Sequence, residues 1–188
     1  MNMLYRSAIG FILGALLLCI LWPYKQQFID NDLEPNFTVL ESDEMYFNNT
    51  RTVHYRTIEN EDLNTAGLRI HRMSKSLKDT SSNYFNFAII NHWKEDCAYI
   101  VLEPSNSSLF SDTTSIVIGD SVMNILINRM DYENHYYVAS EIFKRSLNYE
   151  IPYLISGNDS AFLFGTYKNT KINEITLKDY FRLIGKFR

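Results

Sequence analysis

The chain has 188 residues and a formal net charge of −4, with 22 acidic residues against 18 lysine and arginine residues. All of the acidic residues follow Lys25, so the negative charge belongs to the larger, C-terminal part of the chain. A protein that binds nucleic acid needs a basic surface, and this charge balance argues against that class. The part beyond the N-terminal region is long enough to bury the core of one ordinary domain.

The first segment of the chain is an apolar run that extends from Ala8 to Trp22. Taken alone it is short for a hydrocarbon layer of roughly 30 Å, but extension back to Met3, with Arg6 directed to the headgroups, gives a length of about 20 residues. Its bulky end does not match the small residues of a signal-peptide cleavage site. We therefore expect an uncleaved transmembrane signal-anchor.

The apolar run has other possible interpretations besides a single membrane anchor. Cys19 suggests a lipoprotein signal, although Leu18 stands where that signal needs a small residue. A buried helix of a globular protein is the other alternative, but a helix that is apolar on all sides is typical of a membrane span. Gly10 and Gly14 form a GxxxG pair that lets two helices approach closely, so both a homodimer and a single anchor are compatible with the run.

The charges around the run predict its orientation. Arg6 precedes it, whereas Asp30, Asp32 and Glu34 follow it, so the positive-inside rule favours a cytoplasmic N-terminus. The expected location is a bacterial inner membrane with the bulk of the chain in the periplasm. The expected organisation is a cytoplasmic stub and anchor over 1–24, an acidic linker over 25–35 and an extracytoplasmic domain over 36–188.

Short segments with β propensity and alternating polarity dominate the chain after residue 36. The candidate strands are Phe37–Leu40, Thr52–Ile58, Leu68–Met73, Tyr84–Asn91, Cys97–Leu102, Thr114–Ile118, Ser121–Ile127, Ile151–Ile155 and Ala161–Tyr167. The turn-like connections between them favour antiparallel pairing over a regular alternation of strand and helix.

Two helices are predicted in the same region. Asp131 can cap a helix over Asp131–Leu147, and Thr176 can cap a second one over Leu177–Phe187. The predicted fold class is therefore α+β, with a single N-terminal transmembrane helix followed by one domain that has a mainly antiparallel sheet and two helices.

A basic stripe recurs every four residues on the second predicted helix. Its members are Lys178, Arg182 and Lys186. Such a stripe can contact anionic headgroups or an acidic partner. The alternative is a solvated face that also favours the helix C-terminus.

The sequence Gly119-Asp120-Ser121 follows a hydrophobic segment and resembles the nucleophile block of the SGNH hydrolases. Gly157-Asn158-Asp159 is similar to a later block of that family. The resemblance implies Ser121 as nucleophile, with Gly119 and Asn158 binding the oxyanion of an ester or acetyl substrate. That family takes its base from a later histidine, whereas here no histidine follows His135. The favoured interpretation is a β-hairpin turned by Gly119 and Asp120, with a passage from strand to helix as the other alternative.

No metal or cofactor site is predicted. The four histidines are far apart in the sequence, and none has a histidine or cysteine at ligand spacing. Cys97 is the only cysteine outside the apolar run, so an intrachain disulfide is not expected.

These patterns predict a non-enzymatic function. The expected protein is a membrane-anchored interaction or accessory subunit of an envelope complex, with protein partners and no nucleic acid. The alternative is a membrane-tethered esterase, similar to SGNH enzymes, that acts on envelope glycans or lipids.

Overall fold

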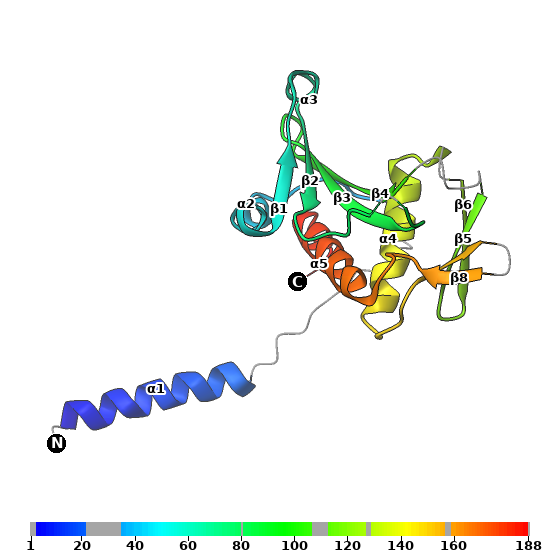
Figure 1. Cartoon of the computed structure of the whole chain (residues 1–188). Helices are drawn as coiled ribbons and strands as arrows, with labels where there is room; N and C mark the ends of the chain where they lie inside the picture. The colour runs from blue at the N-terminus through cyan, green and yellow to red at the C-terminus, as the bar shows by residue number, and fades with distance from the viewer. Residues whose placement is uncertain are drawn as a thin grey trace.

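The structure is a computed structural model of the chain, and it describes residues 3–21, 35–79, 81–106, 113–126, 129–156 and 159–187. In these ranges the chain forms five α-helices and two four-stranded antiparallel sheets (Figure 1). The predicted fold is wrong, because it joined the strands in one sheet behind a membrane anchor. It also lacked two helices, α2 (Glu41–His54) and α3 (Glu61–Ala66).

The first helix, α1, spans Met3–Leu21. Its 19 residues, at a rise of 1.5 Å each, give a length of about 28 Å, and the predicted span needed Trp22 as well, which lies outside the described residues. Across the described ranges, no helix has the combination of length and apolar character that a membrane crossing requires. The predicted transmembrane signal-anchor and the single-pass location based on it are therefore wrong. Of the predicted linker 25–35, only Pro35 is described.

The first sheet has the strand order β1-β2-β3-β4. Its strands are β1 (Tyr55–Ile58), β2 (Leu68–Met73), β3 (Phe85–His92) and β4 (Cys97–Pro104). Ile89 is in register with His71 on one side and Ile100 on the other, and all three are fully buried. The predicted strand Thr52–Ile58 is wrong in its first half, because α2 continues to His54.

The second sheet has the order β6-β5-β7-β8. Its strands are β5 (Thr113–Ile118), β6 (Ser121–Leu126), β7 (Tyr153–Ser156) and β8 (Asp159–Phe162). The hairpin predicted at Gly119 and Asp120 is confirmed: these two residues join β5 to β6, and Gly119 has the positive φ of 54° that glycine adopts without strain.

Helix α4 (Tyr132–Ser146) begins where the sequence predicted, after the N-cap Asp131, whose carboxylate accepts a hydrogen bond from the Asn134 N–H at 2.8 Å. It stands between the two sheets (Figure 1). Helix α5 (Tyr167–Leu183) packs on the first sheet and begins after the N-cap Thr166. The predicted start at Thr176 is therefore wrong, because that residue is buried in the middle of α5.

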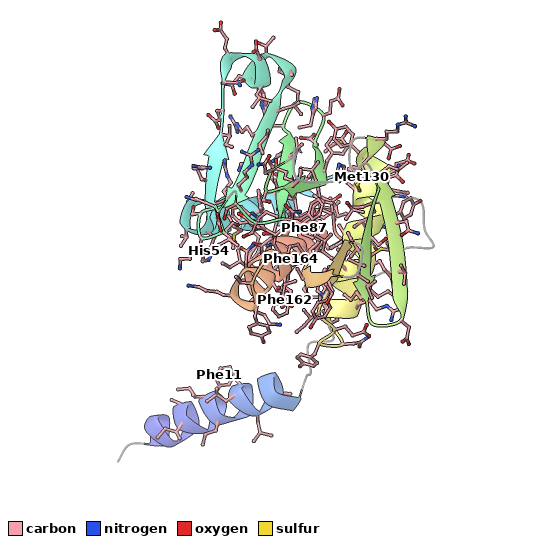
Figure 2. The ribbon with its side chains drawn as sticks, turned by 45° about the vertical axis from the view of Figure 1, so that its right-hand side comes forward. Phe11, His54, Phe87, Met130, Phe162 and Phe164 are labelled. Atoms are coloured by element: carbon pink, nitrogen blue, oxygen red, sulfur yellow. The ribbon has the colours of Figure 1, made fainter. Side chains whose placement is uncertain are left out.

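The two sheets and the helices α4 and α5 share one hydrophobic core. Phe87 of the first sheet lies against Phe164, which precedes α5, with their ring centroids 5.6 Å apart (Figure 2). Phe143 of α4 stacks on Phe181 of α5 at 5.0 Å. Burial of each such ring contributes roughly 1.5–3 kcal/mol, so this core fixes α4 in its place beside β6.

Candidate functional site

A cavity of about 460 Å³ lies between the edge strand β6 and helix α4. We call it the β6–α4 groove. Its lining residues are Met123, Asn124, Ile125, Leu126, Arg129, Met130, Asn134, Tyr137, Val138 and Glu141. It is formed where the second sheet lies beside the flank of α4. Met130, labelled in Figure 2, lies between the two elements in the sequence and is one of the lining residues.

The periodicity of each element explains which side chains enter the groove. Side chains alternate between the two faces of a strand, so Met123 and Ile125 point to the inner face of β6, toward α4. Asn134, Val138 and Glu141 recur at intervals of three and four and so share one face of α4. Ile125 and Val138 are buried and form an apolar floor.

Strand β6 has a free edge along this groove. In a hairpin with a two-residue turn, the residues that flank the turn, here Ile118 and Ser121, form a hydrogen-bonded pair. Along the rest of the two strands, hydrogen-bonded pairs alternate with pairs whose main-chain groups point away from each other. The main-chain groups of Val122, Asn124 and Leu126 therefore point away from β5. On that side, no strand pairs with β6 within the described residues.

A network of charged side chains closes the end of the groove near the hairpin turn. Arg145 donates from Nε to Oε1 of Glu141 at 2.9 Å and from Nη2 to Oγ of Ser121 at 2.7 Å. The Ser121 hydroxyl in turn donates to Oε1 of Glu141 at 3.1 Å. The hydrogen bond to Glu141 raises the pKa of Arg145. Arg145 therefore forms an ion pair with Glu141, and its Nη1 also lies 3.4 Å from Oε2 of Glu150.

The structure brings only part of the predicted esterase residues together. Ser121 opens β6 with Glu141 and Arg145 as its side-chain partners, and no histidine contacts its hydroxyl among the described residues. Gly119 lies in the turn, where a side chain would overlap the carboxylate of Glu150. Asn158 lies outside the described residues. The group in contact with Ser121 is therefore an ion pair.

The other predicted contact residues lie far from the groove along the chain. Open space surrounds Gly10 and Gly14 on α1. On α5, Lys178 lies over the ring of Phe187 at 5.4 Å, and Arg182 lies over the ring of Tyr46 at 3.5 Å. The predicted stripe does not continue along the helix, because α5 ends at Leu183. The half-buried Lys186 lies beyond that end.

The titratable side chains give no metal-binding cluster. Within the ranges that the structure describes, no three histidine, cysteine or acidic residues are grouped closely enough to hold a metal ion. Burial, with the nearby carboxylates of Glu95 and Asp96, raises the pKa of the Cys97 thiol. That shift disfavours the nucleophilic thiolate.

The groove was not predicted from the sequence, although signals for each of its walls were present. The alternation in β6 and the spacing in α4 indicated one buried face on each element. Neither pattern predicts that the two faces lie opposite each other, because that arrangement depends on the packing of α4 against β4 and α5.

No protein-family model, no curated protein and no solved structure matches this chain.

Proposed function

We propose that the protein is a non-enzymatic interaction subunit that binds an extended segment of a partner protein as an added strand along β6. One observation carries this proposal: a strand edge without a paired neighbour in the described chain runs along a cavity with an apolar floor. In strand addition, main-chain hydrogen bonds supply affinity, and pockets for alternate side chains supply specificity.

The dimensions of the groove support this mode of binding. Its volume of about 460 Å³ lies within the range of roughly 300–1,000 Å³ that is usual for ligand pockets. A strand added beside β6 places every second side chain on the same face as Met123 and Ile125, and therefore inside the groove. The outward main-chain groups of Val122, Asn124 and Leu126 are the ones that can pair with it.

The contacts of Ser121 support an interaction role over an esterase. A serine nucleophile needs a base that can take its proton and then release it. Here the hydroxyl donates to Glu141, whose carboxylate also accepts a hydrogen bond from Arg145. Oε1 of Glu141 is thus shared between Ser121 and Arg145, and no histidine contacts the hydroxyl among the described residues. The same contacts hold the hairpin onto α4 and so keep the groove in shape.

A proline substitution on β6 tests the proposal. Short random peptides are displayed on phage and selected on the full-length protein, and the enriched peptides are measured by fluorescence anisotropy. Asn124→Pro removes an outward N–H without removing a hydrogen bond to β5, which an edge strand tolerates. We expect it to weaken peptide binding by about tenfold or more, the equivalent of about 1.4 kcal/mol.

Two variants serve as controls. Asn124→Ala keeps the outward N–H but removes the side-chain oxygen that accepts from Ser115 at 2.7 Å, so it reports the side-chain effect alone. Ser160→Pro places the same change on β8, at the opposite edge of the sheet. Both controls should bind the peptides as the unaltered protein does. If no peptide is enriched, or if Asn124→Pro binds as well as Asn124→Ala, strand addition at β6 is refuted.

A further inference from the structure

The charges that line the β6–α4 groove are not balanced. Glu141 is paired with Arg145 at one end. At the other end stands Arg129, which is exposed and makes no ion pair or hydrogen bond with the residues that the structure describes. Among the charged residues that line the groove, Arg129 is therefore the one that makes no ion pair with the described residues, and its charge is positive.

The acidic group nearest to Arg129 in sequence does not neutralise it. Asp131 caps α4, and its Oδ1 accepts hydrogen bonds from the main-chain N–H and from Nδ2 of Asn134, each at 2.8 Å. Asp131 is not among the residues that line the groove. A free guanidinium beside an apolar floor is a favourable position for a carboxylate, which it can bind through two parallel hydrogen bonds.

We propose that the segment added along β6 carries a carboxylate at the end that lies beside Arg129, followed by apolar side chains at alternate positions. This inference rests on the proposed strand addition and names its partner: an extended peptide with an acidic end. The apolar side chains pack on the floor formed by Ile125 and Val138, beside Met123, and the carboxylate pairs with Arg129.

The direction of the added strand determines the source of the carboxylate. Arg129 follows the C-terminal end of β6. A parallel segment brings its own C-terminal end to Arg129, so either its terminal carboxylate or an acidic side chain can bind there. An antiparallel segment brings its N-terminal end, and then only an aspartate or glutamate side chain can supply the charge. The shared chemistry is a carboxylate, and the two sources are separable by experiment.

The test uses the full-length protein and synthetic versions of the peptides enriched in the display experiment. Each peptide is made with its acidic residue or the corresponding amide, and with a free or an amidated C-terminus. We expect one of the two amide replacements, that of the acidic side chain or that of the C-terminus, to weaken binding by about tenfold or more. The replacement that weakens binding identifies which carboxylate binds Arg129. Arg129→Glu should lose binding to the same extent and should regain it for a peptide in which lysine replaces the acid.

Arg56→Glu is the matched control, because Arg56 is an exposed arginine on β1, in the other sheet. It makes the same change of charge and should leave peptide binding unaltered. The inference is overturned if neither amide replacement weakens binding, or if Arg129→Glu binds the peptides as well as Arg56→Glu does. In that case sensitivity to Asn124→Pro still supports strand addition, whereas a failure to enrich any peptide refutes both proposals.

Discussion

The hydroxyl of Tyr55 donates a hydrogen bond to Oδ2 of Asp179 at 2.9 Å, and this bond joins β1 to α5 inside the protein. Both residues are 7% exposed. Burial, together with the negative charge of Asp179, raises the pKa of Tyr55, so the phenol remains a donor. Burial also raises the pKa of Asp179, and the bond from Tyr55 partly offsets that effect.

Tyr55→Phe should destabilise the protein because it leaves the buried Asp179 carboxylate without this donor. A hydrogen bond to a charged group contributes about 1.5–3 kcal/mol, and we expect a loss of that size in the free energy of unfolding. Urea denaturation followed by circular dichroism measures it. Tyr153→Phe is the control, since Tyr153 is exposed and its ring contact with Phe162 does not need the hydroxyl. Equal stability of Tyr55→Phe and the unaltered protein would contradict the assignment.

A fully buried histidine should make stability depend on pH. His71 lies between Thr57, whose Oγ1 is 3.0 Å from its Nδ1, and the ring of Phe47. Burial, with the positive charges of Arg51 and Arg69, lowers its pKa from 6.5 to about 4. The folded protein therefore binds this proton less readily than the unfolded chain does. The contribution of neutral His71 to the free energy of unfolding is fully present above about pH 6.5. It is lost as the pH falls from there through 4, and the total loss is about 3 kcal/mol.

Denaturation at a series of pH values checks this expectation. His71→Gln removes the titrating group, so the fall in stability between about pH 6.5 and 4 should become smaller. A residual slope should remain because burial also lowers the pKa of His135. An unchanged slope in His71→Gln would show that the buried imidazole is not its source.

The hairpin turn that borders the groove should be sensitive to a single methyl group. Gly119 has a φ of 54°, and a Cβ there would overlap the Glu150 carboxylate, which pairs with Arg145 at 3.4 Å. Gly119→Ala should cost about 1–2 kcal/mol through backbone strain and displacement of Glu150. The double variant with Glu150→Ala separates the two causes: it should recover the part due to overlap and keep the part due to strain. Full additivity of the two changes would exclude the overlap.

The local sequence pattern was sufficient to predict an element where neighbouring residues in the sequence determine its structure. The hairpin at Gly119 and the capped start of α4 at Asp131 both depend on neighbours in sequence, and both were predicted. The first half of the segment Thr52–Ile58 has β propensity but lies in α2, because burial of Phe47 holds that helix against the first sheet. Local propensity was overridden there by tertiary packing.

The start of α5 shows a second limit of prediction from sequence. The predicted helix began after Thr176 because that residue can act as an N-cap. Asn169 and Asn173, which are poor residues for a helix interior, lie before it. In the structure both are buried in α5 and form hydrogen bonds to Asn86 of β3, and these bonds offset their low propensity. The β6–α4 groove was not predicted either, because the position of its two walls depends on contacts between residues that are distant in the sequence.

Asn173→Ala should be among the more costly single substitutions in α5. The Asn173 Oδ1 accepts the main-chain N–H of Phe87 at 2.7 Å, and its Nδ2 donates to Asn86 at 3.1 Å. The side chain is 1% exposed, so water cannot replace these bonds. Leaving a buried donor without a partner costs about 1–3 kcal/mol. We expect at least the upper part of that range because Nδ2 also donates to the main-chain carbonyl of Asn169, so three hydrogen bonds are lost.

Amide hydrogen exchange distinguishes this local effect from a general loss of stability. In Asn173→Ala the Phe87 N–H should exchange faster than its neighbours in β3 even after correction for the change in global unfolding. Asn148→Ala, at an exposed position after α4, removes the same atoms and should alter stability by less than about 0.5 kcal/mol. If the Phe87 amide keeps its protection in Asn173→Ala, its hydrogen bond to Asn173 does not stabilise the contact between β3 and α5. In that case the packing of Phe87 alone holds the strand on the helix.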